Sequence, residues 1–356
     1  MKHPLHFCFF PRSHISALTS ETYSEAGGNG KINKLPTAIF LILFFSLVFL
    51  ILWVRLFAPP GNSNETEVFV VPQIVFYDVT AKSLMDQGFI KSTKAFIFLL
   101  DNFTKPAEIK PGGYKLSRNM NAWQVMKKIT GDPDMVWITI SFCPRKEQVG
   151  EKLAAALKWD NSKLNNWNNL YKNDKPEYFE GVYYPDTYLI PVDETPAQVA
   201  QRFLGRFNEK FAPFTNEFIA RDIKWTTGLK IASLIAREAG GVGDMKLISG
   251  IIWNRLNSDM RLQIDSTMQY TLGKREDGSW WGPVSLSEKK NDSPYNSYLH
   301  EGLPPTPICS PNTDAIEAAL NPQETDCLYY LHDSAKEIHC AITYEGHLSN
   351  IKTYLK

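Results

Sequence analysis

The longest apolar stretch of the chain lies near its N-terminus. It reads LPTAIFLILFFSLVFLILWV at positions 35–54 and contains no charged side chain. About 20 residues of this kind are needed for an α-helix to cross the hydrocarbon core of a bilayer. The stretch is longer than the apolar part of a cleaved signal peptide, and no small-residue cleavage site follows it before Pro59 and Pro60. The pattern therefore predicts a single uncleaved transmembrane helix at residues 35–55.

Charged residues on either side of this helix predict its orientation. Only Arg55 follows it closely, whereas four basic side chains precede it: Lys2, Arg12, Lys31 and Lys34. Because loops on the cytoplasmic side of a membrane are enriched in Lys and Arg, we expect the N-terminus in the cytoplasm. This predicts a cytoplasmic tail at residues 1–34, a linker at 56–67 and an extracytoplasmic location for the rest of the chain.

Short segments after the linker predict a small α+β module at residues 68–134. Its expected elements are, in order, a strand at 68–71, a helix at 80–87, a strand at 114–116 and a helix that begins after Asn121. The first helix is expected to end at Gly88, because glycine commonly terminates helices. The fold class that follows is α+β.

A larger mixed α/β domain is expected at residues 135–356, beginning with an alternating strand at 135–140. The sequence Thr-Pro-Ala-Gln at 195–198 is a helix start signal, because Thr caps the first turn, Pro suits the first helical position and Gln suits the third. Apolar residues then recur on one face: Val199, Phe203, Phe207 and Phe211. Asp244 is expected to cap another helix that runs to about Leu256.

The most informative pattern is the segment LKIASLIAREAGG at 229–241. Ile231, Leu234 and Ile235 form the buried stripe of a helix, and the next position on that stripe is Glu238. Two glycines follow, so Glu238 also lies in the last turn, near the negative end of the helix dipole. Both surroundings favour the protonated carboxyl group and raise its pKa, so Glu238 can act as a general acid and, once ionised, as a base.

An ion pair is the alternative role for Glu238. Buried acids often pair with arginines, and Arg255 and Arg261 follow within the same region. Periodicity alone leaves catalysis and pairing both open.

Composition narrows the classes of function. The 38 basic and 38 acidic side chains balance, which removes the positive field that nucleic-acid binding requires, so we expect no nucleic-acid partner. The five cysteines and seven histidines show no metal-ligand spacing, and we expect no metal site. Cys309, Cys327 and Cys340 lie in one region, and two of them can form a disulfide if this region is exported. The simpler expectation is that the cysteines are unpaired and serve as small buried apolar side chains.

Several segments together resemble the YceG-like (MltG) family of endolytic murein transglycosylases. They occur in the family's order and spacing: FEGVYYPDTY at 179–188, IASLIAREAG at 231–240, MRLQIDSTMQY at 260–270, SPYNSY at 293–298 and GLPPTPI at 302–308. The resemblance covers about residues 66–356, and the single N-terminal anchor is also the family's arrangement. It implies a LysM-like module at 68–134 and a YceG-like catalytic domain at 135–356.

The resemblance also implies a mechanism. The family's catalytic glutamate ends an Ala-Ser-x-x-x-x-Glu motif, which here is Ala232, Ser233 and Glu238. Glu238 would protonate the oxygen between N-acetylmuramic acid (MurNAc) and N-acetylglucosamine (GlcNAc). It would then take the proton of the muramyl C6 hydroxyl, which attacks C1 and leaves a 1,6-anhydro end without any cofactor. The implied partners are peptidoglycan glycan strands, the cell membrane and the cell-wall synthesis machinery.

Seven further residues are candidates for substrate binding: Arg255, Gln263, Asp265, Thr267, Tyr295, Asn296 and Tyr298. If residues 263–267 are extended, the candidates in this segment project to one side and line a groove; alternatively, Asp265 caps a turn. The three candidates at 295–298 lie in a Pro-containing loop that presents rings and amides to a sugar or packs against the fold. Arg255 orients the substrate or buttresses the acid.

The leading function is a lytic transglycosylase, which is a carbon–oxygen lyase and would terminate glycan elongation. Two other functions are also compatible with the sequence. If Asp265 lay within a few ångströms of Glu238, a muramidase-type hydrolase would follow, because hydrolases use two carboxylates. Departures from the family pattern at 141–143 and at Thr306 fit a noncatalytic, membrane-anchored scaffold that binds peptidoglycan. The acid retained on an apolar stripe favours an enzyme.

Overall fold

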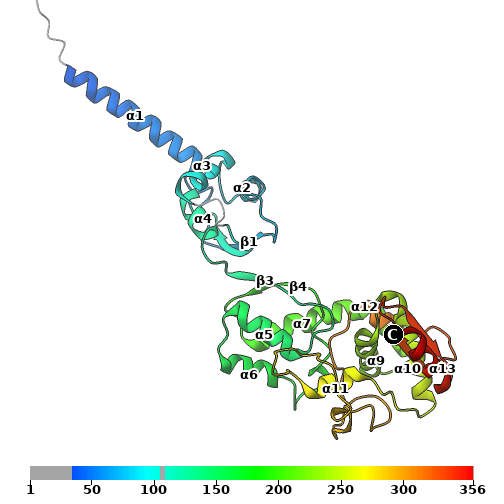
Figure 1. Ribbon diagram of the computed structural model, residues 1–356. Helices are drawn as coiled ribbons and strands as arrows, with labels where there is room; N and C mark the ends of the chain where they lie inside the picture. The colour runs from blue at the N-terminus through cyan, green and yellow to red at the C-terminus, as the bar shows by residue number, and fades with distance from the viewer. Residues whose placement is uncertain (1–33, 105–108, 356) are drawn as a thin grey trace, which may run out of the picture. The chain divides into compact units, whose positions relative to one another are not determined.

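A computed structural model describes residues 34–104 and 109–355 of the chain. Its first element is the helix α1 (Lys34–Leu56), shown in Figure 1. The apolar stretch Ala38–Leu56 has a mean hydropathy of 2.8, is not buried against other parts of the chain, and is long enough to cross a membrane. The expected helix is therefore present, whereas the expected tail lies outside the described residues apart from Lys34.

The chain from Val54 onward is a separate compact unit. Its first described elements are β1 (Thr66–Val71), α2 (Tyr77–Asp86), α3 (Thr93–Phe103), β2 (Gly112–Ser117) and α4 (Ala122–Ile129). The strands pair antiparallel, and a capping box between Asn121 and Gln124 begins α4. The elements predicted here are confirmed, and α3 is one that the pattern did not reveal.

Two further strands extend the sheet formed by β1 and β2. They are β3 (Met135–Thr139) and β4 (Thr187–Pro191), and the antiparallel sheet has the order β1-β2-β3-β4. Buried apolar side chains form two separate clusters, one between Phe69 and Ile129 and the other between Ile138 and Leu320. The second cluster holds the candidate catalytic segment.

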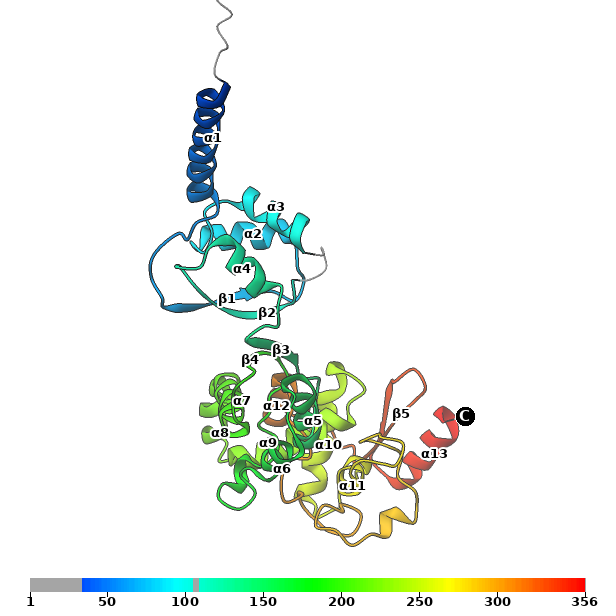
Figure 2. The same ribbon diagram turned by 90° about the vertical axis from the view of Figure 1, so that its left-hand side faces the viewer.

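The larger cluster is built mainly from helices. They are α5 (Lys146–Leu157), α6 (Asn161–Asn169), α7 (Pro196–Phe211), α8 (Thr215–Ala220), α9 (Trp225–Glu238), α10 (Met245–Asn257), α11 (Asp265–Leu272) and α12 (Thr313–Leu320). Outside this cluster, a hairpin of β5 (Tyr329–His332) and β6 (Ile338–Ala341) packs against α13 (Tyr344–Tyr354). Figure 2 shows α9 among α10, α11 and α12, and each of these three helices contacts α9.

Two helix starts were predicted in this region. The capping box at Thr195 and Gln198 begins α7, and its four apolar positions are buried, so that prediction is confirmed. Asp244 directly precedes α10, which ends at Asn257, so the predicted start and end of this helix are confirmed; the side chain of Asp244, however, makes no capping hydrogen bond to the helix. The backbone at Asp244 is already helical, so its carboxylate instead accepts hydrogen bonds from the backbone nitrogens of Gly240 at 2.9 Å and Gly241 at 3.1 Å.

Four cysteines form two disulfides. Cys143 pairs with Cys309, and Cys327 pairs with Cys340, with Cα–Cα separations of 5.1 and 5.9 Å. Both separations are ordinary for a disulfide. The expectation of unpaired buried cysteines is therefore wrong for these four, because folding brings together residues that lie 166 positions apart in one pair and 13 apart in the other. Cys8 lies outside the described residues.

Candidate active site

Glu238 is the last residue of α9, and its side chain is half-buried. The stripe that precedes it is fully buried, as the periodicity predicted: Ile231, Leu234 and Ile235 have no exposed surface. The backbone leaves the helical conformation at Ala239, so the chain turns away immediately after the acid. The helix thus holds a carboxyl group at the boundary between the core and the surface.

Two hydroxyl groups hold the two carboxyl oxygens of Glu238. Ser266 on α11 donates to Oε1 at 2.8 Å, and Tyr330 on β5 donates to Oε2 at 2.8 Å. No ion pair within the described part of the chain involves Glu238. The alternative that Glu238 pairs with Arg255 or Arg261 is therefore wrong.

Burial raises the pKa of Glu238 above its ordinary value, and the negative charge of Asp265 raises it further. The hydrogen bonds from Tyr330 and Ser266 and the charge of Arg237 oppose this rise without cancelling it. The pKa of Tyr330 is itself raised well above its ordinary value by burial and by the charge of Glu238, so Tyr330 stays a neutral donor. A carboxyl group of this kind can hold a proton and release it to a substrate.

Arg255 lies on α10 and is buried, and it does not form the expected ion pair with Glu238. Its guanidinium donates to three backbone carbonyls, those of Leu328 at 2.6 Å, Leu262 at 2.5 Å and Arg261 at 3.3 Å. Arg255 therefore connects two chain segments, one leading to Ser266 and the other to Tyr330.

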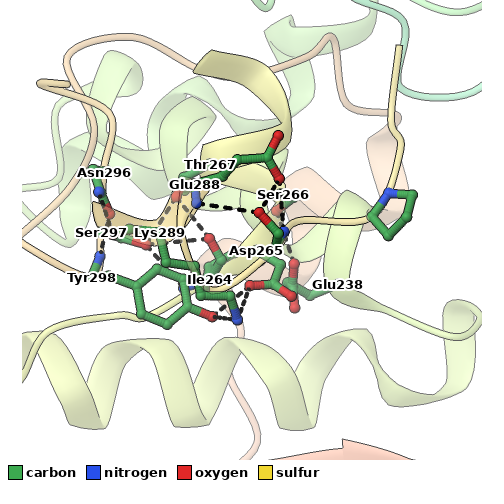
Figure 3. A network of polar contacts seen from close by, with 12 residues as sticks. Glu238, Ile264, Asp265, Ser266, Thr267, Glu288, Lys289, Asn296, Ser297 and Tyr298 are labelled. Carbon is green, nitrogen blue, oxygen red and sulfur yellow. Dashed lines mark hydrogen bonds and ion pairs between the residues drawn. The ribbon is translucent and has the colours of Figure 1, made fainter. Parts of the chain in front are cut away.

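Residues 263–267 are not extended, so the expected alternation of side chains is wrong. Gln263 has a positive φ of 52°, and Asp265 is the first residue of α11, where the side-chain period is that of a helix. Thr267 is fully buried; its hydroxyl donates to the carbonyl of Ile264 at 2.7 Å and lies 2.9 Å from that of Ser297. Figure 3 shows Ile264, Asp265, Thr267 and Ser297 around the start of α11.

Asp265 belongs to a polar cluster beside Ser266. Lys289 forms an ion pair with it at 2.8 Å, and the hydroxyl of Tyr298 donates to the same carboxylate oxygen at 2.5 Å (Figure 3). Lys289 also donates to the hydroxyl of Tyr298 at 2.8 Å. The structure thus places Asp265, with its partner Tyr298, directly beside Ser266, which donates to Glu238, and it adds Lys289, which no pattern in the sequence indicated.

Asn296 and Tyr295 shape the loop that carries Tyr298. The buried amide of Asn296 donates to the carbonyls of Lys289 at 3.0 Å and Asn291 at 2.7 Å. The Tyr295 ring packs on Tyr270 with centroids 4.8 Å apart. Contact of these two side chains with a substrate stays a prediction.

A loop with two adjacent tryptophans contacts Arg237, the residue before Glu238. The Arg237 guanidinium, next to Glu238 in sequence, lies 4.0 Å from the ring centroid of Trp281, whose indole donates to Gln148 at 3.1 Å. Trp280 lines a neighbouring cavity of about 300 Å³ together with residues of α5. The adjacent tryptophans between Gly278 and Gly282 were the available signal for this loop.

Glu180 is a fully buried acid near the larger core, and no pattern in the sequence indicated it. It accepts hydrogen bonds from the backbone nitrogens of Lys146 at 3.2 Å and Gly181 at 3.0 Å and from the hydroxyl of Tyr270 at 3.3 Å. Burial and the charge of Glu147 raise its pKa to about 8. Gly181 has a φ of 89°, and a Cβ there would lie 2.7 Å from Pro307, so the acid sits on a turn that requires glycine.

The described residues contain no group of three or more side chains suited to bind a metal ion. His332 and His339 lie near single carboxylates instead, Asp244 at 2.6 Å and Asp333 at 2.9 Å.

The chain is similar to known proteins over most of its length. The model of the YceG-like family matches residues 69–353. The chain belongs to the YceG-like family. A Bacillus subtilis protein named endolytic murein transglycosylase is 26% identical over 323 residues, which cover 84% of this chain and 88% of that protein. A Streptococcus pneumoniae protein of the same name is 32% identical over 177 residues, which cover 49% of this chain and 32% of that protein, so the chain spans about a third of that relative's length.

A solved structure supports the same assignment. The crystal structure of a YceG-like protein from Listeria monocytogenes superposes with a TM-score of 0.55 at 25% identity, covering 81% of this chain and 99% of that one. The YceG-like match includes Glu238, Ser266 and Tyr330, so the whole candidate site lies within the family region.

Proposed function

We propose that this chain is a membrane-anchored endolytic lytic transglycosylase that cleaves the MurNAc–GlcNAc bond of nascent peptidoglycan. The observation that carries the proposal is the half-buried carboxyl group of Glu238, whose pKa is raised and whose two oxygens are each held by one hydroxyl. The names of the bacterial relatives support the same substrate.

The reaction needs one group that gives and takes a proton. Protonated Glu238 donates its proton to the glycosidic oxygen, and the bond between that oxygen and C1 of MurNAc breaks. The resulting carboxylate takes the proton of the C6 hydroxyl, whose oxygen forms a bond to C1. The products are a 1,6-anhydro-MurNAc end and a free GlcNAc hydroxyl, and Glu238 returns to its protonated state without consuming water.

A muramidase-type hydrolase is the second candidate, and one observation favours it. Asp265 directly precedes Ser266, and its charge acts on the pKa of Glu238, so a second carboxylate is close enough to interact with the acid. Hydrolases use such a carboxylate as a nucleophile or to activate water. In the structure Lys289 and Tyr298 occupy the Asp265 carboxylate, which favours a supporting role for Asp265.

The location follows from the anchor. We infer that α1 crosses the cell membrane once with the N-terminus in the cytoplasm, because basic residues precede it. Two disulfides in the region after α1 suit an oxidising compartment outside the cell. The proposal further assigns glycan binding to a LysM-like module at 68–134 and assigns to the enzyme a role in ending glycan elongation beside the cell-wall synthesis machinery.

The products of the reaction test the function. The full chain in detergent micelles is incubated with uncrosslinked glycan strands, and the new ends are identified by mass spectrometry. We expect 1,6-anhydro ends from the native chain, none from Glu238→Gln, and native product from Glu209→Gln, a matched change of an exposed glutamate on α7.

The same assay separates the alternatives. Reducing ends that disappear in Asp265→Asn would make the chain a hydrolase. Binding of strands by both the native chain and Glu238→Gln, with cleavage by neither, would make it a scaffold.

A further inference from the structure

We propose that Tyr330 is a positioning residue for Glu238, and that a clamp formed by Arg255 and the Cys327–Cys340 disulfide holds it there. The proposal rests on the proposed function, since it assigns to Tyr330 the orientation of the acid that performs the reaction. Tyr330 does not need to touch the substrate for this role.

The contact itself is specific. The Tyr330 hydroxyl donates to Oε2 of Glu238 at 2.8 Å, while Ser266 donates to Oε1 at 2.8 Å from the opposite element, α11. With both oxygens engaged, rotation of the carboxyl group is restricted and the direction in which its proton is offered is defined. If either donor is removed, one carboxyl oxygen loses its hydrogen bond and the carboxyl group of Glu238 can rotate.

The disulfide acts on the strand that carries Tyr330. Tyr330 is paired with Cys340 across the β5–β6 hairpin, and Cys340 is bonded to Cys327, three positions before Tyr330. The backbone nitrogen of Leu328 also donates to the carbonyl of Ala341 at 3.0 Å. A two-stranded hairpin is marginally stable by itself, so a covalent bond at the residue opposite Tyr330 restricts its displacement.

Helix α10 supplies the second half of the clamp. Arg255 donates to the carbonyl of Leu328, immediately before β5, and to that of Leu262, in the segment that leads to Ser266. Asn254 donates to the carbonyls of Thr325 at 2.6 Å and Cys327 at 3.2 Å. One buried guanidinium therefore ties together the two segments whose hydroxyl groups hold Glu238.

The titratable and charged groups around Glu238 allow the effect to be measured by pH. They are the charged Asp265 on α11 and Arg237 on α9 and the neutral Tyr330 on β5, whose own pKa is affected by Arg255 and Tyr298. The hydrogen bond from Tyr330 favours the ionised form of Glu238, so its loss raises the pKa of Glu238. Because the general acid must be protonated, the alkaline limb of the pH–rate profile then moves to higher pH.

The test compares Tyr330→Phe, which removes only the hydroxyl, with the native full chain. We expect the alkaline limb of kcat to move up by about one pH unit, as a hydrogen bond to a charged group implies. At low pH, where Glu238 is protonated in both chains, we expect kcat to fall about tenfold through lost orientation, with KM unchanged. Tyr344→Phe, on α13, is the matched control and is expected to leave the profile unchanged.

A variant lacking the disulfide tests the clamp. Cys327→Ser with Cys340→Ser is expected to move the profile in the same direction as Tyr330→Phe, and the triple variant is expected to resemble Tyr330→Phe, because both changes remove one interaction. Superimposable profiles of the native chain and Tyr330→Phe would overturn the proposal, as would additive effects in the triple variant. Either result leaves the proposed function intact as long as Glu238→Gln is inactive; anhydro ends from Glu238→Gln would overturn the proposed function itself.

Discussion

The buried acid Glu180 predicts an unusual dependence of stability on pH. Its carboxyl group has a pKa of about 8 in the folded chain, against an ordinary value of 4.5. The folded state therefore retains a proton that the unfolded state releases, and stability is lost as the pH rises from the unfolded to the folded pKa. The favourable contribution is complete below the unfolded value and absent above about pH 8.

The magnitude follows from the same values. Between pH 5 and pH 8 the unfolded carboxyl group is ionised and the folded one is not, so each pH unit costs about 1.4 kcal/mol, or about 4 kcal/mol over the window. Glu180→Gln removes this titration while keeping the shape of the protonated acid. Lys146, whose pKa burial lowers to about 8, is present in both chains, so its own contribution cancels to first order.

The assay is urea unfolding of the full chain in detergent, followed by tryptophan fluorescence at pH 5, 6.5 and 8. We expect the free energy of unfolding of the native chain to fall relative to Glu180→Gln by about 4 kcal/mol across this range. A constant difference between the two chains at all three values would refute the argument, whatever the size of that difference, because a loss of packing alone does not depend on pH.

Three further variants test packing, helix propensity and cross-linking. A Cβ at Gly228 on α9 would lie 1.9 Å from the ring of Phe218, so Gly228→Ala should lower the free energy of unfolding by about 1–3 kcal/mol; Gly205→Ala on α7, with open space around it, should raise it by about 0.5–1 kcal/mol. Replacing Cys143 and Cys309 by Ser should cost about 3–5 kcal/mol, since their disulfide closes a loop of 166 residues. Urea midpoints check all three, and an unchanged midpoint would contradict the corresponding argument.

Short sequence motifs predicted helix starts correctly where the stabilising hydrogen bonds join residues close together in the sequence. The caps at Asn121 and Thr195 each satisfy backbone nitrogens within four residues, so the sequence shows both the cap and its partner. The prediction of an extended segment at 263–267 was wrong because the contacts of this segment are with residues distant in the sequence. Its alternating polar residues resemble a strand, but burial of Thr267 against Ser297 makes a helix the better packing.

The candidate site likewise combines features that the sequence predicts with contacts that only folding creates. A helix long and apolar enough to span a membrane and the position of Glu238 at the end of a buried stripe could both be predicted from the sequence, because the first depends on an unbroken apolar run and the second on helical periodicity, each within about 20 residues. The surroundings of the acid emerge only in the folded chain: Ser266 lies 28 positions away in sequence, Tyr330 lies 92 away, and Arg255 joins their segments through backbone carbonyls. Such contacts arise from packing between distant elements, and no local propensity encodes them.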